Sequence, residues 1–156
     1  MSDNQNDTNT DTDTEPSIIP EGFNESGYAP FSKHIGPFVY KKETDSEGNV
    51  QGSVGVVMTD THIGGNNRGH GGLMLTILDE AMGMTAALQK GGQPVVTLSM
   101  HSNFIAGTTP GQFLRATGTI TQTTATVAFV EGKAWCGDTL VGSASGVWKY
   151  LRKRDK

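Results

Sequence analysis

The feature that most constrains the fold of this chain is one long apolar stretch, residues 69–89, which is followed by Gly91-Gly92. Its apolar residues recur at helical spacing, and further apolar residues cover most of the remaining helix surface. The two sets are Leu73, Ile77, Ala81, Met84 and Leu88, then Met74, Leu75, Leu78, Met82 and Ala86. A helix that is apolar nearly all round is buried in a core rather than laid on a surface. The sequence therefore predicts a central helix that the rest of the chain covers.

Two features of this predicted helix indicate chemistry. His70, Gly71 and Gly72 lie at its start, where backbone N–H groups have no partner within the helix and can bind a negatively charged atom. Asp79 places a carboxylate among leucines and methionines. Burying a charge is costly unless the charge is paired or the site needs it. Asp79 is therefore a candidate catalytic group, and a structural acid tied to a hydroxyl or backbone N–H is the alternative.

Runs typical of β-strands lie on both sides of the helix. Before it, residues 37–41 and 50–58 flank a turn of Asp, Ser, Glu, Gly and Asn, and together they predict a hairpin. Phe31 and Ile35 have the spacing of a short helix that closes one end of the core. After the long helix, four β-rich runs with short connectors predict an antiparallel meander. They are residues 95–106, 111–122, 125–135 and 139–150.

This order of elements predicts an α+β fold, in which a curved antiparallel sheet wraps around one long central helix. A single sheet of about six strands cannot cover a helix on every side. The uncovered side is therefore expected to meet a second copy of the chain, which predicts a homodimer.

The two ends of the chain differ from its middle in composition. Residues 1–21 are mostly Asp, Asn, Thr and Ser and predict a disordered acidic tail, whereas residues 22–151 form the folded domain. Residues 1–25 hold seven acids and no base, so the remainder carries 12 basic residues against 16 − 7 = 9 acidic ones. Residues 152–156 form a basic tail, which either is solvated or contacts phosphates.

Composition also excludes several classes of protein. Cys136 is the single cysteine, so no disulfide can form within the chain. The sequence has neither an apolar run long enough to span a membrane nor a secretory signal, and we expect a cytoplasmic protein that binds no membrane. Basic residues do not alternate with aromatic ones, which disfavours nucleic-acid binding. No Ser nucleophile motif and no Cys–His pair indicates a catalytic triad.

Several ordered motifs resemble those of a known family. They are His62, His70-Gly71-Gly72, Asp79 nine residues after His70, Ala81-Met82-Gly83, Val96-Thr97-Leu98, Asn103-Phe104, Pro110-Gly111, Phe129-Val130-Glu131-Gly132 and Ala144-Ser145-Gly146-Val147-Trp148. With this spacing, residues 22–151 resemble the hot-dog-fold thioesterases of the 4-hydroxybenzoyl-CoA thioesterase superfamily, in the phenylacetate-pathway acyl-CoA thioesterase group. The resemblance implies hydrolysis of an acyl-CoA thioester at a dimer interface, in a dimer or a dimer of dimers, with no cofactor and no metal.

The resemblance also implies roles for individual residues. The backbone N–H of Gly71 polarises the thioester carbonyl, and Asp79 reaches in from the other subunit as general base or nucleophile. Thr97 helps to place the attacking water. The family usually has asparagine two residues after His62, where this chain has Gly64. The neighbouring Asn66 and Asn67 are candidate replacements.

Further substrate-binding candidates come from the residues themselves. Gly72 adds a second amide at the helix start, and Met82 is a candidate for the acyl pocket, together with Met74, Leu78 and Phe104. His70 has two interpretations, as an acid–base catalyst or as a loop residue that orients its neighbours, and the second is favoured. A metal held by His62 and His70 is disfavoured because no third ligand accompanies them.

Two other functions remain open at this point. A hydratase or dehydratase of the same fold also pairs a histidine with an acid, here His70 with Asp79, near an acyl thioester. A non-catalytic module that binds acyl-CoA is the other alternative, because Gly64 replaces the family asparagine.

Overall fold

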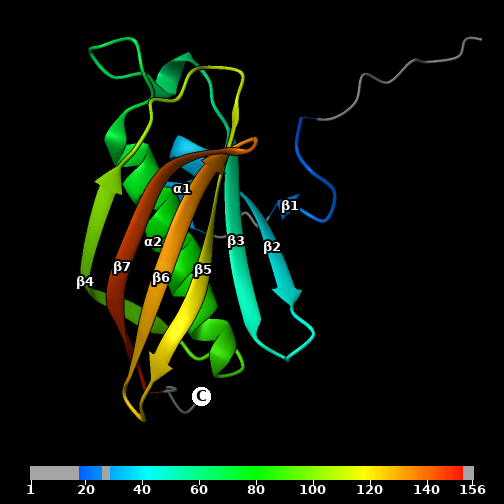
Figure 1. Cartoon of the computed structure of the whole chain (residues 1–156), viewed down its shortest axis with the longest axis vertical. Coiled ribbons are helices and arrows are strands. Elements are labelled where there is room, and N and C mark those ends of the chain that lie inside the picture. Colours follow the sequence, from blue (N-terminus) through cyan, green and yellow to red (C-terminus); the bar gives the residue numbers. More distant parts are fainter. Residues whose placement is uncertain (1–17, 26–28, 153–156) are drawn as a thin grey trace, which may run out of the picture.

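The computed structural model describes residues 18–25 and 29–152 of the chain (Figure 1). Most of the predicted acidic tail, residues 1–17, and the last four residues of the predicted basic tail lie outside the described residues. The elements in chain order are β1 (Asn24–Glu25), α1 (Pro30–Ile35), β2 (Val39–Thr44), β3 (Val50–Val57), a 3₁₀ turn (Asp60–His62), α2 (Gly71–Gln89), β4 (Val95–Phe104), β5 (Phe113–Thr123), β6 (Val127–Cys136) and β7 (Thr139–Tyr150).

The strands form one antiparallel sheet in the order β1-β2-β3-β5-β6-β7-β4, and α2 lies along one face of it (Figure 1). The predicted curved sheet around one long helix is confirmed, and the hairpin is β2–β3. The predicted four-strand meander is wrong in one strand, since β4 pairs with β7 instead of β5. The connection through α2 carries the chain across the sheet face to the far edge, and β5 returns to pair with β3.

The predicted role of Phe31 in closing the core is also wrong. Its side chain is 61% exposed. On the six-residue helix α1 the inward side is formed by Ser32, which is buried, and Ile35, which packs against the core. So short a helix buries only one side of its surface, and these two residues lie on that side.

Helix α2 fits closely into the sheet because glycines face it from three adjacent strands. A Cβ at Gly118 of β5 would lie 2.5 Å from the Thr85 hydroxyl, and a Cβ at Gly132 of β6 would lie 2.5 Å from the Met82 sulfur. Gly142 of β7 faces Met74 in the same way. The backbones of helix and sheet therefore approach more closely than strands with side chains would allow.

Thr85 ties α2 to the sheet at this contact. Its side chain is fully buried and donates a hydrogen bond to the Ala81 carbonyl at 2.8 Å, while it accepts one from the Gly52 N–H of β3 at 2.8 Å. A buried amide without a partner is costly, so this hydroxyl satisfies a donor that the strand ladder leaves free.

We expect Gly118→Val to destabilise the fold strongly. The added Cβ would also lie 3.0 Å from two backbone atoms of α2, the Ala81 oxygen and the Met82 Cα, which cannot rotate away. Overpacking of this kind costs about 1–3 kcal/mol and occasionally more. Chemical denaturation at one fixed protein concentration measures the change.

Gly65→Val is the matched control for this substitution. A Cβ at Gly65 meets nothing within 4 Å, so its free energy of unfolding should change by less than about 0.5 kcal/mol. Equal stability of the two variants would contradict the close packing of α2 on the sheet.

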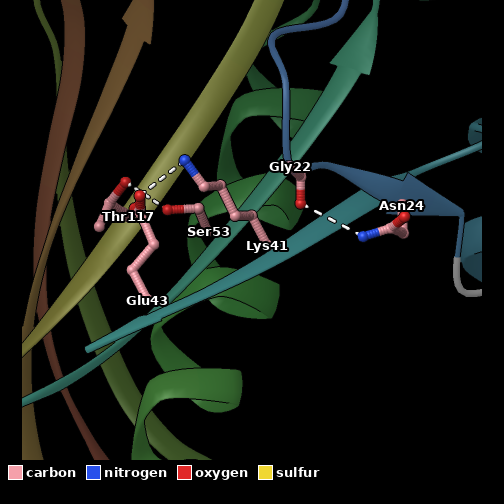
Figure 2. Close-up of polar contacts among 6 residues, drawn as sticks. All are labelled: Gly22, Asn24, Lys41, Glu43, Ser53 and Thr117. Carbon is pink, nitrogen blue, oxygen red and sulfur yellow. Dashed lines mark hydrogen bonds and ion pairs between the residues drawn. The ribbon is translucent and has the colours of Figure 1, made fainter.

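The outer face of the sheet carries a group of polar side chains on β2, β3 and β5. The Ser53 and Thr117 hydroxyls lie 2.8 Å apart across the β3–β5 pair, and Lys41 forms an ion pair of 2.6 Å with Glu43. Both contacts are drawn in Figure 2. The helix lies on the opposite side of these strands in the same view. No helix in the described part of the chain is long and apolar enough to cross a membrane.

Candidate active site

The N-terminus of α2 presents one free backbone donor. His70 is the N-cap, with an extended backbone, and its Nδ1 accepts the Gly72 N–H at 2.9 Å. The Leu73 N–H donates to the His70 carbonyl at 3.0 Å. The Gly71 N–H has no hydrogen-bond partner among the described residues. The capping geometry thus leaves the Gly71 amide, and not that of Gly72, to bind an external acceptor.

A network of hydrogen bonds fixes the loop before this amide. The His70 N–H donates to the His62 carbonyl at 2.7 Å, and the Gly69 N–H donates to the Thr108 carbonyl at 2.8 Å. The buried His62 ring accepts the Thr59 N–H at Nδ1 and lies 2.7 Å from the Ile35 carbonyl through Nε2. Both ring nitrogens of His62 are therefore occupied, and neither is available to a metal ion.

The free Gly71 amide borders a cavity of about 370 Å³. Met74 and Phe104 form part of its apolar wall, and a Cβ at Gly71 would lie 2.9 Å from the Phe104 ring. The polar residues Asn66 and Arg68 also line this cavity. An acceptor that enters this cavity can reach the positive end of the helix dipole.

Of the two asparagines considered near Gly64, the structure brings only Asn66 to this cavity. Asn66 Oδ1 accepts the Arg68 N–H at 3.2 Å. Asn67 is exposed, does not line the cavity, and has a φ of 57°, in the left-handed region that asparagine tolerates better than most residues. The turn that Asn67 forms accounts for an asparagine at this position.

Asp79 and Thr97 meet in a second hollow. The Thr97 hydroxyl donates a hydrogen bond to Asp79 Oδ1 at 2.6 Å. Asp79 is half-buried and lines a cavity of about 660 Å³ together with Glu80, Trp148 and several apolar side chains. These are Met84, Ala87, Leu88, Val95 and Val96. The carboxylate expected to be buried is thus held by one hydroxyl at the wall of an open cavity.

Met82, the candidate for the acyl pocket, lies elsewhere. It is 0% exposed and packs against Gly132 in the core, outside the linings of both cavities. Leu78 is buried in the same core cluster. The residues of α2 that line the first cavity are Gly71 and Met74, and those that line the second are Asp79, Glu80, Gly83, Met84, Ala87 and Leu88.

A β-bulge in β4 brings residues of both cavities to the helix side. Thr97 pairs with Trp148 and Ser99 with Val147, so Leu98 is the extra residue. Thr97 contacts Asp79, and Phe104 approaches Gly71. Seven positions separate Thr97 from Phe104, and a regular strand would put them on opposite faces. The bulge restores both to one face.

Glu80 is a cavity residue that sequence reasoning missed. Its Oε1 accepts the Ser32 hydroxyl at 3.0 Å, and its carboxylate lines the same hollow as Asp79. A signal for it was present, because a second acid on an apolar helix carries the same burial cost as the first. Within the described residues, no group of three or more His, Cys, Asp or Glu side chains could hold a metal ion.

Comparison with known proteins identifies the family. The sequence profile of the thioesterase superfamily matches residues 66–143, which include both cavity-lining stretches of α2 and β4. This chain belongs to the thioesterase superfamily. A Pseudomonas aeruginosa protein named provisionally as an esterase is 27% identical over 132 residues, which cover 83% of this chain and 96% of that one.

Solved structures confirm the hot-dog fold of this thioesterase-superfamily chain. The Escherichia coli PaaI protein from the phenylacetic acid degradation operon is 16% identical, with a TM-score of 0.68 over 80% of this chain and 86% of that one. A Streptococcus mutans protein bound to acetyl-CoA is 20% identical, with a TM-score of 0.62 over 74% of this chain and 91% of that one.

Proposed function

We propose that this chain is an acyl-CoA thioesterase whose active site is shared by two copies. The observation that carries the proposal is the placement of two complementary groups on one helix. The free Gly71 amide and the Asp79 carboxylate line different cavities of the same copy. One group suits a developing oxyanion, and the other suits the activation of water or direct attack.

Within one copy these two groups are too far apart to act on one thioester. They are eight positions apart on α2, which corresponds to about 12 Å along the helix axis. A carbonyl carbon must lie about 3 Å from its attacking atom, with its oxygen at hydrogen-bond distance from the donor. The Asp79 that completes the site of one Gly71 therefore comes from a second copy.

Strand β4 offers the surface for that second copy. It stands at the end of the strand order and pairs only with β7 among the described strands. It also exposes large apolar side chains, with Leu98 56% and Phe104 57% exposed. An edge strand of this kind is a template for pairing with another chain.

The positions of the two cavities suggest the axis of this pairing. Thr97 lies near Asp79 toward one end of β4, and Phe104 lies near Gly71 at the other end. A twofold axis between Met100 and His101 would place Thr97 opposite the partner's Phe104. The symmetric contact then sets Asp79 of one copy beside the Gly71 cavity of the other, twice in each dimer.

The proposed reaction follows from these groups. The thioester carbonyl accepts the Gly71 N–H at the positive end of α2, which stabilises the oxyanion as it forms. Asp79 acts either as general base, taking a proton from water as the water oxygen attacks the carbonyl carbon, or as nucleophile, in which case its oxygen forms a mixed anhydride that water then hydrolyses to regenerate the carboxylate. The C–S bond breaks as the tetrahedral intermediate collapses, and coenzyme A leaves as a thiolate that takes up a proton, which in the general-base route is the proton that Asp79 took from water. Thr97 orients the carboxylate through its hydrogen bond.

Two relatives support this assignment. The name of the Pseudomonas aeruginosa relative places it among hydrolases of ester bonds, and the Streptococcus mutans neighbour holds acetyl-CoA. The residues assigned here need no cofactor for the hydrolysis. A dimer of dimers and a cytoplasmic location, both expected from the sequence, complete the proposal.

We expect the purified protein to release thiol from at least one member of a panel of short, medium, long and aromatic acyl-CoAs. The cavity beside Asp79 has mainly apolar walls, which suit an acyl chain or ring. A thiol-reactive dye follows the release, and light scattering during size-exclusion chromatography measures the oligomeric state. Release of thiol by a strictly monomeric protein would contradict the shared site.

The same panel separates the two competing functions. A hydratase would add water across a double bond of an enoyl-CoA and leave the thioester intact, which mass spectrometry of the product detects. A binding module would hold acyl-CoA without any turnover. Either result would overturn the thioesterase proposal.

A further inference from the structure

Arg68 is the only lysine or arginine among the residues that line the cavity beside Gly71, and none of those residues is an acid. The cavity beside Asp79 has the opposite character, because Asp79 and Glu80 line it and no lysine or arginine does. The two cavities that would combine at one site therefore carry charges of opposite sign.

The guanidinium of Arg68 is available for a ligand. The side chain is exposed, and it makes no hydrogen bond or ion pair with any described residue. The ion pair found in the described part of the chain joins Lys41 to Glu43 on the outer face. A planar guanidinium with free N–H groups is well suited to bind phosphate oxygens in pairs.

The position of Arg68 is held by its own loop and by the next one. Its carbonyl accepts the Gly64 N–H at 2.8 Å, and its N–H donates to Asn66 Oδ1 at 3.2 Å. The stem of the side chain lies over Gly107, where an added Cβ would be 3.3 Å from Arg68 Cδ. A side chain that is already ordered in the free protein loses less conformational entropy when a ligand binds.

We infer that Arg68 binds phosphate groups of coenzyme A, so that the nucleotide end of the substrate lies on the Gly71 side of the site and the acyl group lies on the Asp79 side. This inference rests on the acyl-CoA hydrolysis proposed above. It identifies a determinant of the carrier, since a thioester that lacks the nucleotide phosphates cannot contact Arg68 in this way. Arg68 contributes to binding and leaves the reacting atoms to Gly71 and Asp79.

The test is calorimetric binding of free coenzyme A and of pantetheine, which lacks the nucleotide phosphates, to the intact protein. In Arg68→Gln the affinity for coenzyme A should fall about tenfold or more, because charge-assisted hydrogen bonds are lost. The affinity for pantetheine should stay unchanged. Lys133→Gln removes one charge from an exposed position on β6 and should leave both affinities unchanged.

Unchanged affinity for coenzyme A in Arg68→Gln would overturn the inference. An equal loss for both ligands would also overturn it, because that result would indicate a general disturbance of the cavity. A selective loss of coenzyme A affinity in Arg152→Gln, with Arg68→Gln unaffected, would assign the phosphates to the basic C-terminus instead. Binding requires no turnover, so a protein that binds coenzyme A through Arg68 but releases no thiol would contradict the thioesterase proposal alone.

Discussion

Asp79→Asn is expected to lower kcat for acyl-CoA hydrolysis about a hundredfold or more. Asparagine has nearly the same shape, but it can neither take a proton from water nor attack a thioester as a carboxylate does. Its amide oxygen can still accept the Thr97 hydroxyl, so the contact seen at 2.6 Å can be kept. Steady-state thiol release, measured with the best acyl-CoA of the panel, gives the ratio of the variant kcat to the wild-type kcat.

The interpretation of this variant depends on an intact fold and dimer. Size-exclusion chromatography and the thermal midpoint should match those of the wild type at the same protein concentration. Activity equal to the wild type, in a well-folded variant, would remove Asp79 from the mechanism. The catalytic group would then be expected in the loop around Asn66 and His70.

Gly71→Pro is expected to lower kcat about 10²- to 10³-fold, the usual effect of losing one oxyanion donor. Proline has no N–H, and it is favoured at the first position of a helix because its fixed φ suits that position. The residue before it, His70, already has the extended backbone that proline requires of its neighbour (ψ 132°). The substitution therefore deletes the proposed donor with little change to the backbone.

Gly71→Ala is the matched control. It introduces a Cβ with the same close approach to the Phe104 ring as the proline Cβ, but it keeps the N–H. The alanine variant should retain most of the wild-type kcat. Similar losses in both variants would show that the effect comes from crowding against Phe104 and would contradict the role of the amide.

A mixture of the two inactive variants tests whether the site is shared. In a heterodimer of Asp79→Asn and Gly71→Pro, one site combines the intact Gly71 of the first chain with the intact Asp79 of the second. With random exchange of subunits, half of the dimers have one such site, so about a quarter of the wild-type activity should return. No recovery, with exchange shown by mass spectrometry, would place both groups of each site on one chain.

Much of the fold was predictable because its strongest signals are local. The apolar residues of α2 recur along one continuous stretch, and the glycines after Gln89 mark its end within a residue or two. The hairpin β2–β3 follows from a turn-forming run between two β-rich segments. The uncovered edge strand agrees with the need for a second copy, which stays a prediction.

The parts that failed depend on contacts between distant segments. Sequence order alone places β4 beside β5, whereas pairing partners are chosen by the crossover through α2 and by the sheet edge that is still free. Phe31 is apolar, yet the buried stripe of α1 includes Ser32 because that hydroxyl meets Glu80 of α2. The close packing of α2 against Gly132 keeps Met82 in the core, outside the two cavities, and the sequence does not show that these two distant residues meet.

The extra residue at Leu98 shifts the alternation of β4 by half a period. Before it, one parity of residue number faces the helix, and after it the other parity does. The strand can therefore present a hydroxyl to the carboxylate at one end and an aromatic ring to the helix N-terminus at the other. At this position the site depends on the number of residues in the strand and not on the identity of the side chain. A substitution of Leu98 leaves that count intact, whereas the loss of a single codon would turn one half of the strand away from the helix.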